Sequence, residues 1–217
     1  MLESKNIVLW DWNGTLLDDT DICIQAMNML LEKRDIQMLC KEKYREVFDF
    51  PVKDYYSRIG FDFEKEPFEI PAIEFIEEYK MLLPQANLFE DVIETLGYFQ
   101  KKGFRQYIVS AMEKNALIQS VLNRGIYDFF DEVCGISDDY AHGKFHLFGE
   151  LIEKQNISKT KAIIIGDTLH DYEIANKLEI DVVLISRGHQ SHTRLKNTEK
   201  VVLSSLSELI NSRKTNK

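Results

Sequence analysis

The sequence predicts an α/β fold: a Rossmann-like parallel sheet flanked by helices, with an inserted all-helical cap domain. Three observations favour this class. An apolar run at residues 7–10 ends at a carboxylate, which is typical of a strand buried on both faces of a parallel sheet. From residue 88 onward, short apolar runs alternate with segments of helical periodicity. Between these two parts, residues 16–83 show helical patterns and no convincing buried strand.

The first strand, residues 7–10, is followed by Asp11 and then by the pair Asn13–Gly14, which favours a turn because both residues tolerate a positive φ. Apolar residues then recur at helical spacing. This periodicity predicts four helices, centred on residues 22–30, 44–48, 52–59 and 73–79. The segment is therefore expected to fold as a helical block.

The rest of the chain alternates the two kinds of element. Helices are expected at residues 90–102, 112–124, 144–155, 170–178 and 206–211. Strands are expected at residues 106–110, 132–136, 162–166, 182–185 and 201–203. Repeated strand–helix units imply a parallel sheet with helices on both faces. We therefore assign residues 1–15 and 84–217 to a catalytic core, and residues 16–83 to a cap that lies over the strand ends.

The composition limits the partners of the protein. A net charge of -9 argues against a nucleic-acid partner, which would call for basic patches. The three cysteines are scattered and have no metal-ligand spacing, which fits a reducing cytoplasm. No apolar run approaches the length of a membrane-spanning helix. We expect a cytoplasmic protein, a monomer or weak homodimer, that binds neither nucleic acid nor membrane.

Polar residues follow the predicted strands or open helices at four places, namely residues 11–15, 110–111, 144 and 166–171. Because the carboxyl ends of parallel strands meet at one edge of a sheet, these groups can converge there. Carboxylates gathered at one point repel one another unless a cation offsets them, and their hard oxygen ligands suit Mg²⁺. Such a site would attract a phosphate group. A carboxylate nucleophile would then divide the hydrolysis of a phosphate ester into two easier steps, with an aspartyl-phosphate between them.

Together, these residues resemble the motifs of a known enzyme family. The run Asp-Trp-Asn-Gly-Thr-Leu that begins at Asp11, the later Ser110, Lys144, and the Gly-Asp-x-x-x-Asp run at residues 166–171 resemble the four motifs of the haloacid dehalogenase-like hydrolases. The resemblance covers essentially the whole chain, including a helical cap after the first motif as in phosphoglycolate phosphatase-like members. It implies a Mg²⁺-dependent phosphatase-type hydrolase that acts on a small phosphorylated metabolite.

The resemblance also implies roles for individual residues. Asp11 would be the nucleophile and a Mg²⁺ ligand, and Asn13 would give its backbone carbonyl to the metal. Asp167 would be the main second metal ligand. Asp171 would be a further ligand or a partner of the ligands.

For the phosphate group, the resemblance implies contacts from the core. Ser110 and Ala111 would hold the phosphate together with Thr15, and Lys144 would stabilise its charge. In the cap, the candidates for substrate specificity are Lys53, Tyr56 and Arg58. We expect the other polar and aromatic residues to be unremarkable, with His170, His189 and His192 solvated and the cap phenylalanines Phe48 and Phe50 used in packing.

Asn13 departs from the pattern of this family. Phosphatases of the family usually have a second Asp there, which protonates the leaving oxygen and then activates water. A carboxamide can do neither, although the backbone carbonyl remains available. The loss of a general acid typically lowers a rate ~10²–10⁴-fold. Catalysis should therefore be slower, and least so for an acidic leaving group.

Four explanations for Asn13 stay open. The protein is a slow or specialised phosphatase that uses another acid, such as His170 or a cap residue. It cleaves a carbon–phosphorus or carbon–halogen bond; the first motif of phosphonoacetaldehyde hydrolases, Asp-Trp-Ala-Gly-Thr, is close to residues 11–15, and Lys53 would be the cap lysine of that chemistry. It is a phosphate-binding protein that is nearly inactive. Finally, Asn13 deamidates or belongs to an engineered trap.

Overall fold

The computed structural model describes residues 2–136 and 143–211. Its core is a six-stranded sheet in the order β5-β4-β1-β6-β7-β8, with parallel pairing between neighbours. The strands are β1 (Ile7–Trp10), β4 (Arg105–Glu113), β5 (Glu132–Ile136), β6 (Ala162–Gly166), β7 (Asp181–Ile185) and β8 (Val201–Leu203). The parallel sheet confirms the predicted Rossmann-like fold class.

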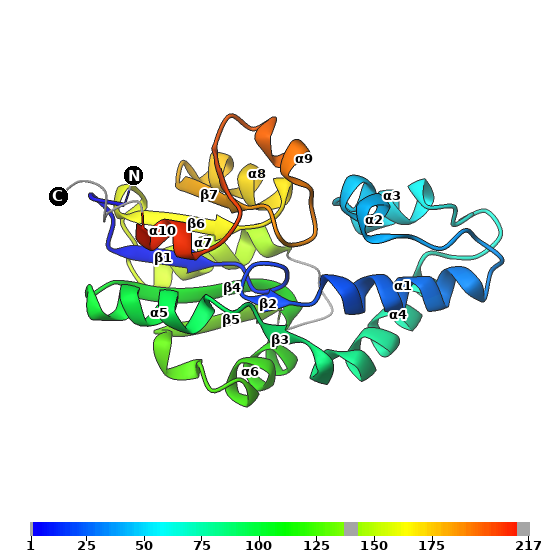
Figure 1. Cartoon of the computed structure of the whole chain (residues 1–217), viewed down its shortest axis with the longest axis horizontal. Coiled ribbons are helices and arrows are strands. Elements are labelled where there is room, and N and C mark those ends of the chain that lie inside the picture. The colour runs from blue at the N-terminus through cyan, green and yellow to red at the C-terminus, as the bar shows by residue number, and fades with distance from the viewer. Residues whose placement is uncertain (1, 137–142, 212–217) are drawn as a thin grey trace.

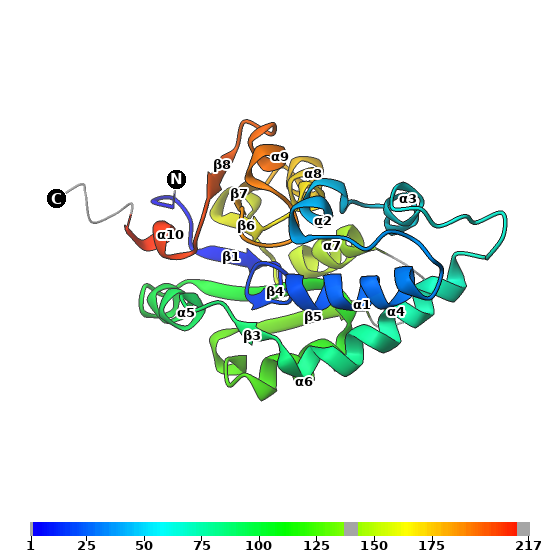
Figure 2. The same ribbon diagram turned by 45° about the vertical axis from the view of Figure 1, so that its right-hand side comes forward.

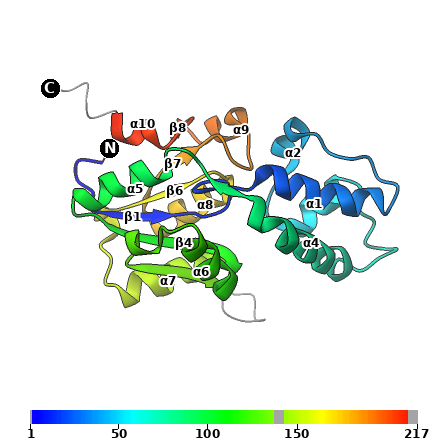
Figure 3. The ribbon, with the colours of Figure 1, turned by 60° about the horizontal axis from the view of Figure 1, so that its bottom comes forward.

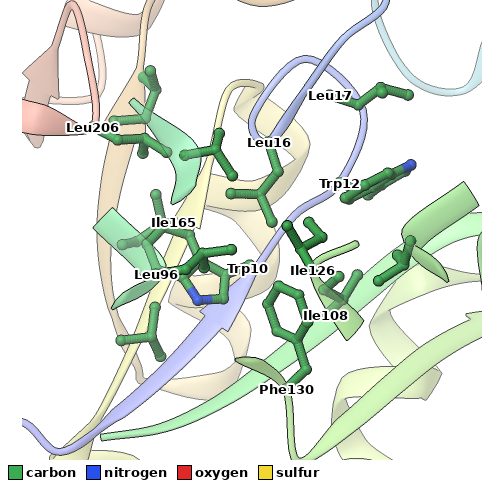
Figure 4. Close-up of a cluster of buried hydrophobic side chains, with 14 of the residues drawn as sticks. Trp10, Trp12, Leu16, Leu17, Leu96, Ile108, Ile126, Phe130, Ile165 and Leu206 are labelled. Carbon is green, nitrogen blue, oxygen red and sulfur yellow. The ribbon is translucent and has the colours of Figure 1, made fainter. Parts of the chain in front are cut away.

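Helices cover both faces of this sheet, because successive residues of a strand point to opposite sides. Val8 and Trp10 of β1 lie in one buried cluster, and Ile7 and Leu9 lie in another. Figure 4 shows Trp10 among its neighbours in the first cluster. The helices that pack into the first cluster are α5 (Val92–Lys101), α6 (Lys114–Asn123) and α10 (Ser207–Asn211). Those that pack into the second are α7 (Lys144–Lys154), α8 (Leu169–Leu178) and α9 (His192–Lys196).

A separate group of helices lies beyond the carboxyl end of β1 (Figure 1, Figure 2 and Figure 3). These helices are α1 (Thr20–Glu32), α2 (Lys41–Val47), α3 (Val52–Arg58) and α4 (Glu69–Leu82). They share a buried cluster that includes Met27, Leu30 and Tyr55. We propose that they form the cap expected at residues 16–83.

A two-stranded antiparallel ribbon joins the two parts. It pairs β2 (Leu17–Asp18) with β3 (Asn87–Leu88), so the chain enters and leaves the helical part at one place. These two-residue strands are too short to produce a periodic pattern, and the sequence did not predict them. Short 3₁₀ helices lie at Leu83–Gln85, Tyr127–Phe129 and Lys159–Lys161.

The boundary between β4 and α6 differs from the prediction. The strand continues to Glu113 instead of ending at Ser110, with a register shift against β5 after Val109. The helix begins at Lys114, because the Glu113 carboxylate accepts hydrogen bonds of 2.8 Å from two backbone N–H groups of the first turn. Glutamate is not a typical N-cap residue, so the sequence did not indicate this start.

Within the described residues, no helix has both the length and the apolar character that crossing a bilayer requires.

Candidate active site

The two neighbouring strands β1 and β6 place Asp11 and Asp167 at the same edge of the sheet. Trp10 pairs with Ile165, and the Asp11 N–H continues this ladder with a 2.8 Å hydrogen bond to the Ile165 carbonyl. Oxygen atoms of Asp11, Asp167 and Asp171 lie within 4.8 Å of one another, and all three residues are buried. The structure therefore brings together the carboxylates that the sequence predicted to converge.

Thr15 holds two of these carboxylates in place. Its hydroxyl lies 3.1 Å from an Asp167 oxygen and 3.3 Å from an Asp11 oxygen. The other Asp167 oxygen accepts a 2.6 Å hydrogen bond from the His189 backbone N–H. Thr15 is fully buried and does not line the cavity described below. Because Thr15 lies beneath the carboxylates, its position is better suited to orienting them than to contacting a phosphate, which is the role that we expected.

Lys144 is the cation of the cluster. It begins α7 directly after Gly143, and its Nζ forms ion pairs with Asp11 and, at 2.6 Å, with Asp171. The other Asp171 oxygen accepts hydrogen bonds from the Thr168 hydroxyl and N–H, which completes a capping box at the start of α8. Both oxygens of Asp171 are thus engaged by the chain itself.

The charges at this edge do not balance, because three carboxylates share one lysine. Burial raises the pKa of Asp11 and the pKa of Asp167 above their ordinary values. Burial alone would also raise the pKa of Asp171, but Lys144 lowers it. Lys144 acts on Asp11 and His189 on Asp167, but neither cation outweighs the effect of burial on these two carboxylates. Their oxygen atoms are suitable ligands for a hard divalent cation, which would offset the excess negative charge.

Asn13 is held by a buried carboxylate that the sequence did not single out. The Asn13 side-chain amide donates to an Asp19 oxygen at 2.7 Å and to the Tyr79 hydroxyl at 2.8 Å. Asp19 is fully buried and also accepts from the Gly14 N–H at 2.8 Å. Since a carboxylate can only accept, the NH₂ group of Asn13 must face Asp19. The Asn13 carbonyl oxygen faces the Ser110 hydroxyl, 3.3 Å away.

His189 is the second residue that sequence reasoning missed. Its Nε2 lies 3.3 Å from an Asp19 oxygen, and its Nδ1 lies 2.9 Å from the Tyr44 hydroxyl. Burial alone would lower the pKa of His189, but Asp19 raises it to about 9. The expectation of a solvated His189 is wrong, because this loop folds inward against α1 and α2. The signal was absent from the sequence, since the contact joins distant segments without periodicity.

The other two histidines differ from each other. His170 was expected to be solvated, but it lines the cavity and its ring stacks on Phe50 with the centroids 4.7 Å apart. Burial lowers the pKa of His170, which favours the neutral imidazole. His192 is exposed, as predicted.

A cavity of about 500 Å³ lies between the sheet edge and the helical part. From the core, Asp11, Asn13 and Lys144 line it together with Ser110 and Ala111. These residues are therefore placed where a phosphate group could contact the carboxylate of Asp11.

The predicted specificity residues of the cap divide into two groups. Tyr56 is buried on α3 and lines the cavity. Lys53 and Arg58 are exposed and do not line it, because α3 turns its two tyrosines inward and these residues outward. The Lys53 ammonium lies 5.6 Å from the centre of the Phe63 ring, and Arg58 pairs with Asp49 at 3.2 Å.

Gly14 is required by its close approach to the carboxylates. Its φ is +72°, and a Cβ atom there would lie 2.3 Å from an Asp167 oxygen and 2.6 Å from a ring carbon of His189. We expect Gly14→Ala to lower the free energy of unfolding by about 2–5 kcal/mol, since it adds this overlap to the left-handed backbone strain. Urea unfolding checks the value.

The matched control for this substitution is Gly103→Ala. Gly103 has nearly the same φ, +75°, and nothing lies within 4 Å of its Cβ position. It should show the backbone strain alone, about 1–2 kcal/mol. Equal losses in the two variants would mean that the contact with Asp167 is not what requires glycine at position 14.

Comparisons with known proteins agree with this arrangement. Residues 8–185 match the family described as haloacid dehalogenase-like hydrolase. The phosphoglycolate phosphatase of Nitrosococcus oceani is 24% identical in an alignment of 222 positions, which covers 97% of each chain. The pyrophosphatase PpaX of Bacillus pumilus is 22% identical over 168 residues, or 76% of each chain.

Among solved structures, a haloacid dehalogenase-like family hydrolase from Streptococcus pneumoniae superposes with a TM-score of 0.83 at 21% identity. The superposition covers 96% of this chain and 98% of that one, which shows the shared fold. The family match spans most of the sequence and includes Asp11, Lys144 and Asp167. The chain therefore belongs to the haloacid dehalogenase-like hydrolases.

Proposed function

We propose that this hydrolase is a Mg²⁺-dependent phosphatase of small phosphorylated molecules that works through an aspartyl-phosphate on Asp11. The observation that carries this proposal is the position of the Asp11 carboxylate. It lies at the floor of the cavity, beside Lys144 and within reach of Asp167. The phosphatase and pyrophosphatase names of the two sequence relatives support the same reaction class.

The carboxylates of Asp11 and Asp167, with the backbone carbonyl of Asn13, would hold the cation. When bound, Mg²⁺ would supply positive charge that stabilises the phosphate oxygens and permits Asp11 to approach them. Asp171 is engaged by Lys144 and Thr168, so we assign it to positioning Lys144.

The residues of the chain would act in two steps. An oxygen of Asp11 attacks phosphorus and the leaving group departs with its electron pair. Lys144, the Ser110 hydroxyl and the backbone of Ala111 stabilise the phosphate oxygens during this step. Water then attacks the phosphorus of the acyl phosphate, which frees phosphate and restores the carboxylate.

Carbon–phosphorus cleavage, the main alternative from the sequence, is less well supported. That chemistry would need a cap lysine that can reach the substrate, and Lys53 is exposed outside the cavity. Among the described cap residues that line the cavity, Lys80 is the only lysine, and it is exposed to solvent. A lysine acts as a nucleophile at neutral pH when it is desolvated, and neither Lys53 nor Lys80 is buried.

Metal binding and turnover test the proposal together. Mg²⁺ at about 100 times its dissociation constant should raise the melting temperature by about 5–10 °C and start the release of phosphate from acetyl phosphate. EDTA should reverse both effects. Asp167→Asn should lose most of the shift, whereas Asp128→Asn, at an exposed site, should keep it. An unchanged shift in Asp167→Asn would contradict the assigned metal ligands, and a shift without any turnover would favour a phosphate-binding protein.

A further inference from the structure

The two sides of the cavity have different chemistry. The core side carries most of the charged residues, among them Asp11, Lys144 and His189. The cap side is lined by many aromatic side chains, including those of Phe48, Phe50, Tyr55, Tyr56, Phe75 and Tyr79. A bound phosphate monoester would therefore place its phosphate against the core and its organic group against aromatic rings.

The cap wall offers little to a second anionic group. Among the described cap residues that line the cavity, Asp19 and Lys80 are the charged ones: Asp19 is itself a carboxylate, and Lys80 lies exposed on α4. Arg34, by contrast, is engaged with Glu66 and Glu74 away from the cavity. A carboxylate pressed against this wall would lose hydration without an enclosed partner, which is unfavourable. A neutral aromatic ring would gain stacking and apolar contacts instead.

An independent observation concerns the proton that an alkoxide leaving group would need. Asn13 has no acidic proton, and its NH₂ group is taken up by Asp19 and Tyr79. The hydroxyl of Tyr79 in turn lies 2.8 Å from Asp19 and can donate to it. Both ring nitrogens of His189 also have partners within the protein. A leaving group that departs without help needs a stable anion. A phenol has a pKa of about 10, whereas the pKa of an aliphatic alcohol is far higher and resembles that of water.

We infer that the substrate is an aryl phosphate monoester whose uncharged aromatic group occupies the aromatic wall of the cap. This inference rests on the proposed phosphatase function. An Asp11 oxygen forms a bond to phosphorus while the bond between phosphorus and the phenolic oxygen breaks, and the electron pair leaves with the phenolate. Water then attacks phosphorus, one proton passes to solvent, and phosphate and the free carboxylate are regenerated. The phenolate takes its proton from water.

Four compounds test the inference on the intact protein with Mg²⁺. Phenyl phosphate and benzyl phosphate both carry a ring, but only the first has an acidic leaving group. Phosphoglycolate is aliphatic and carries a second anion, and acetyl phosphate needs neither a ring nor a proton donor. We expect kcat for phenyl phosphate to exceed that for benzyl phosphate by about 100-fold or more, because Asn13 cannot protonate the benzyl alkoxide as it leaves. Both should show a KM at least about 10-fold below that of phosphoglycolate.

A pair of variants on α4 tests the aromatic wall itself. Phe75 is half-buried and lines the cavity, whereas Ile73 is 58% exposed on the same helix and does not line it. Phe75→Ala should raise KM for phenyl phosphate about 3- to 10-fold more than KM for acetyl phosphate. Ile73→Ala should change neither value.

The outcomes distinguish a failure of the inferred substrate class from a failure of the proposed phosphatase function. If acetyl phosphate is hydrolysed and phosphoglycolate is a better substrate than phenyl phosphate, the inference is overturned and the phosphatase function stands. Equal kcat values for phenyl and benzyl phosphate would also overturn it, by revealing an unrecognised proton donor. If no compound is hydrolysed, the proposed function fails, and the substrate class fails with it.

Discussion

Asp11→Asn is expected to lower turnover of every phosphate ester by at least about 10⁴-fold. The amide is a far poorer nucleophile than the carboxylate, so the covalent route is lost and only binding and electrostatic effects remain. Phosphate release with Mg²⁺ measures the effect. The fold should persist, because burial raises the pKa of Asp11 and its negative charge is therefore unfavourable in the folded protein at pH 7.

The matched control is Asp18→Asn, which removes an exposed carboxylate seven positions further along the chain. It should retain the activity of the unsubstituted protein. Circular dichroism should be the same for all three proteins. If Asp11→Asn kept more than about one tenth of the turnover, a direct attack by water would replace the aspartyl-phosphate in the mechanism.

Exchanging Asn13 and Asp19 should give the largest gain in activity. In the Asn13→Asp, Asp19→Asn double variant, the amide and the carboxylate of the 2.7 Å hydrogen bond change places. A carboxyl group would then face the cavity two residues after the nucleophile and could protonate a leaving oxygen. We expect kcat for benzyl phosphate to rise about 10²–10⁴-fold, the range that a general acid typically supplies. The gain for phenyl phosphate should be much smaller.

The single variants separate the causes of this gain. Asn13→Asp alone places two carboxyl groups within hydrogen-bonding distance, so they should share a proton, and a smaller gain is expected. Asp19→Asn alone adds no acid and should give no gain. If the double variant folds and benzyl phosphate turnover does not rise, the site already has a proton donor, and Asn13 is not what limits the reaction.

The sequence predicted the carboxylate cluster because its parts are local. Asp11 and Asp167 each end a short, strongly apolar strand, and parallel strands bring such ends together. Lys144 opens a helix on the same edge of the sheet. Simple periodicity was enough to place these residues, and the fold confirmed the resemblance that they carried.

The rest of the site depends on contacts that no periodicity reports. In the sequence, Asp19 is one of several acidic residues before a helix and carries no further signal. Its contact with His189 joins segments 170 positions apart. Lys53 and Arg58 attracted attention as charged residues, yet the burial of α3 turned them away from the cavity. Which face of a cap helix meets the core is decided by tertiary packing, so the character of the cavity wall could not be predicted.

The most direct test is a crystal structure of the protein with Mg²⁺ and beryllium fluoride, which mimics a phosphoryl group on a carboxylate. We expect a fluoroberyllate bonded to an Asp11 oxygen, beside Lys144, with the cation between Asp11 and Asp167. A cation bound elsewhere, or a fluoroberyllate that leaves Asp11 free, would contradict it.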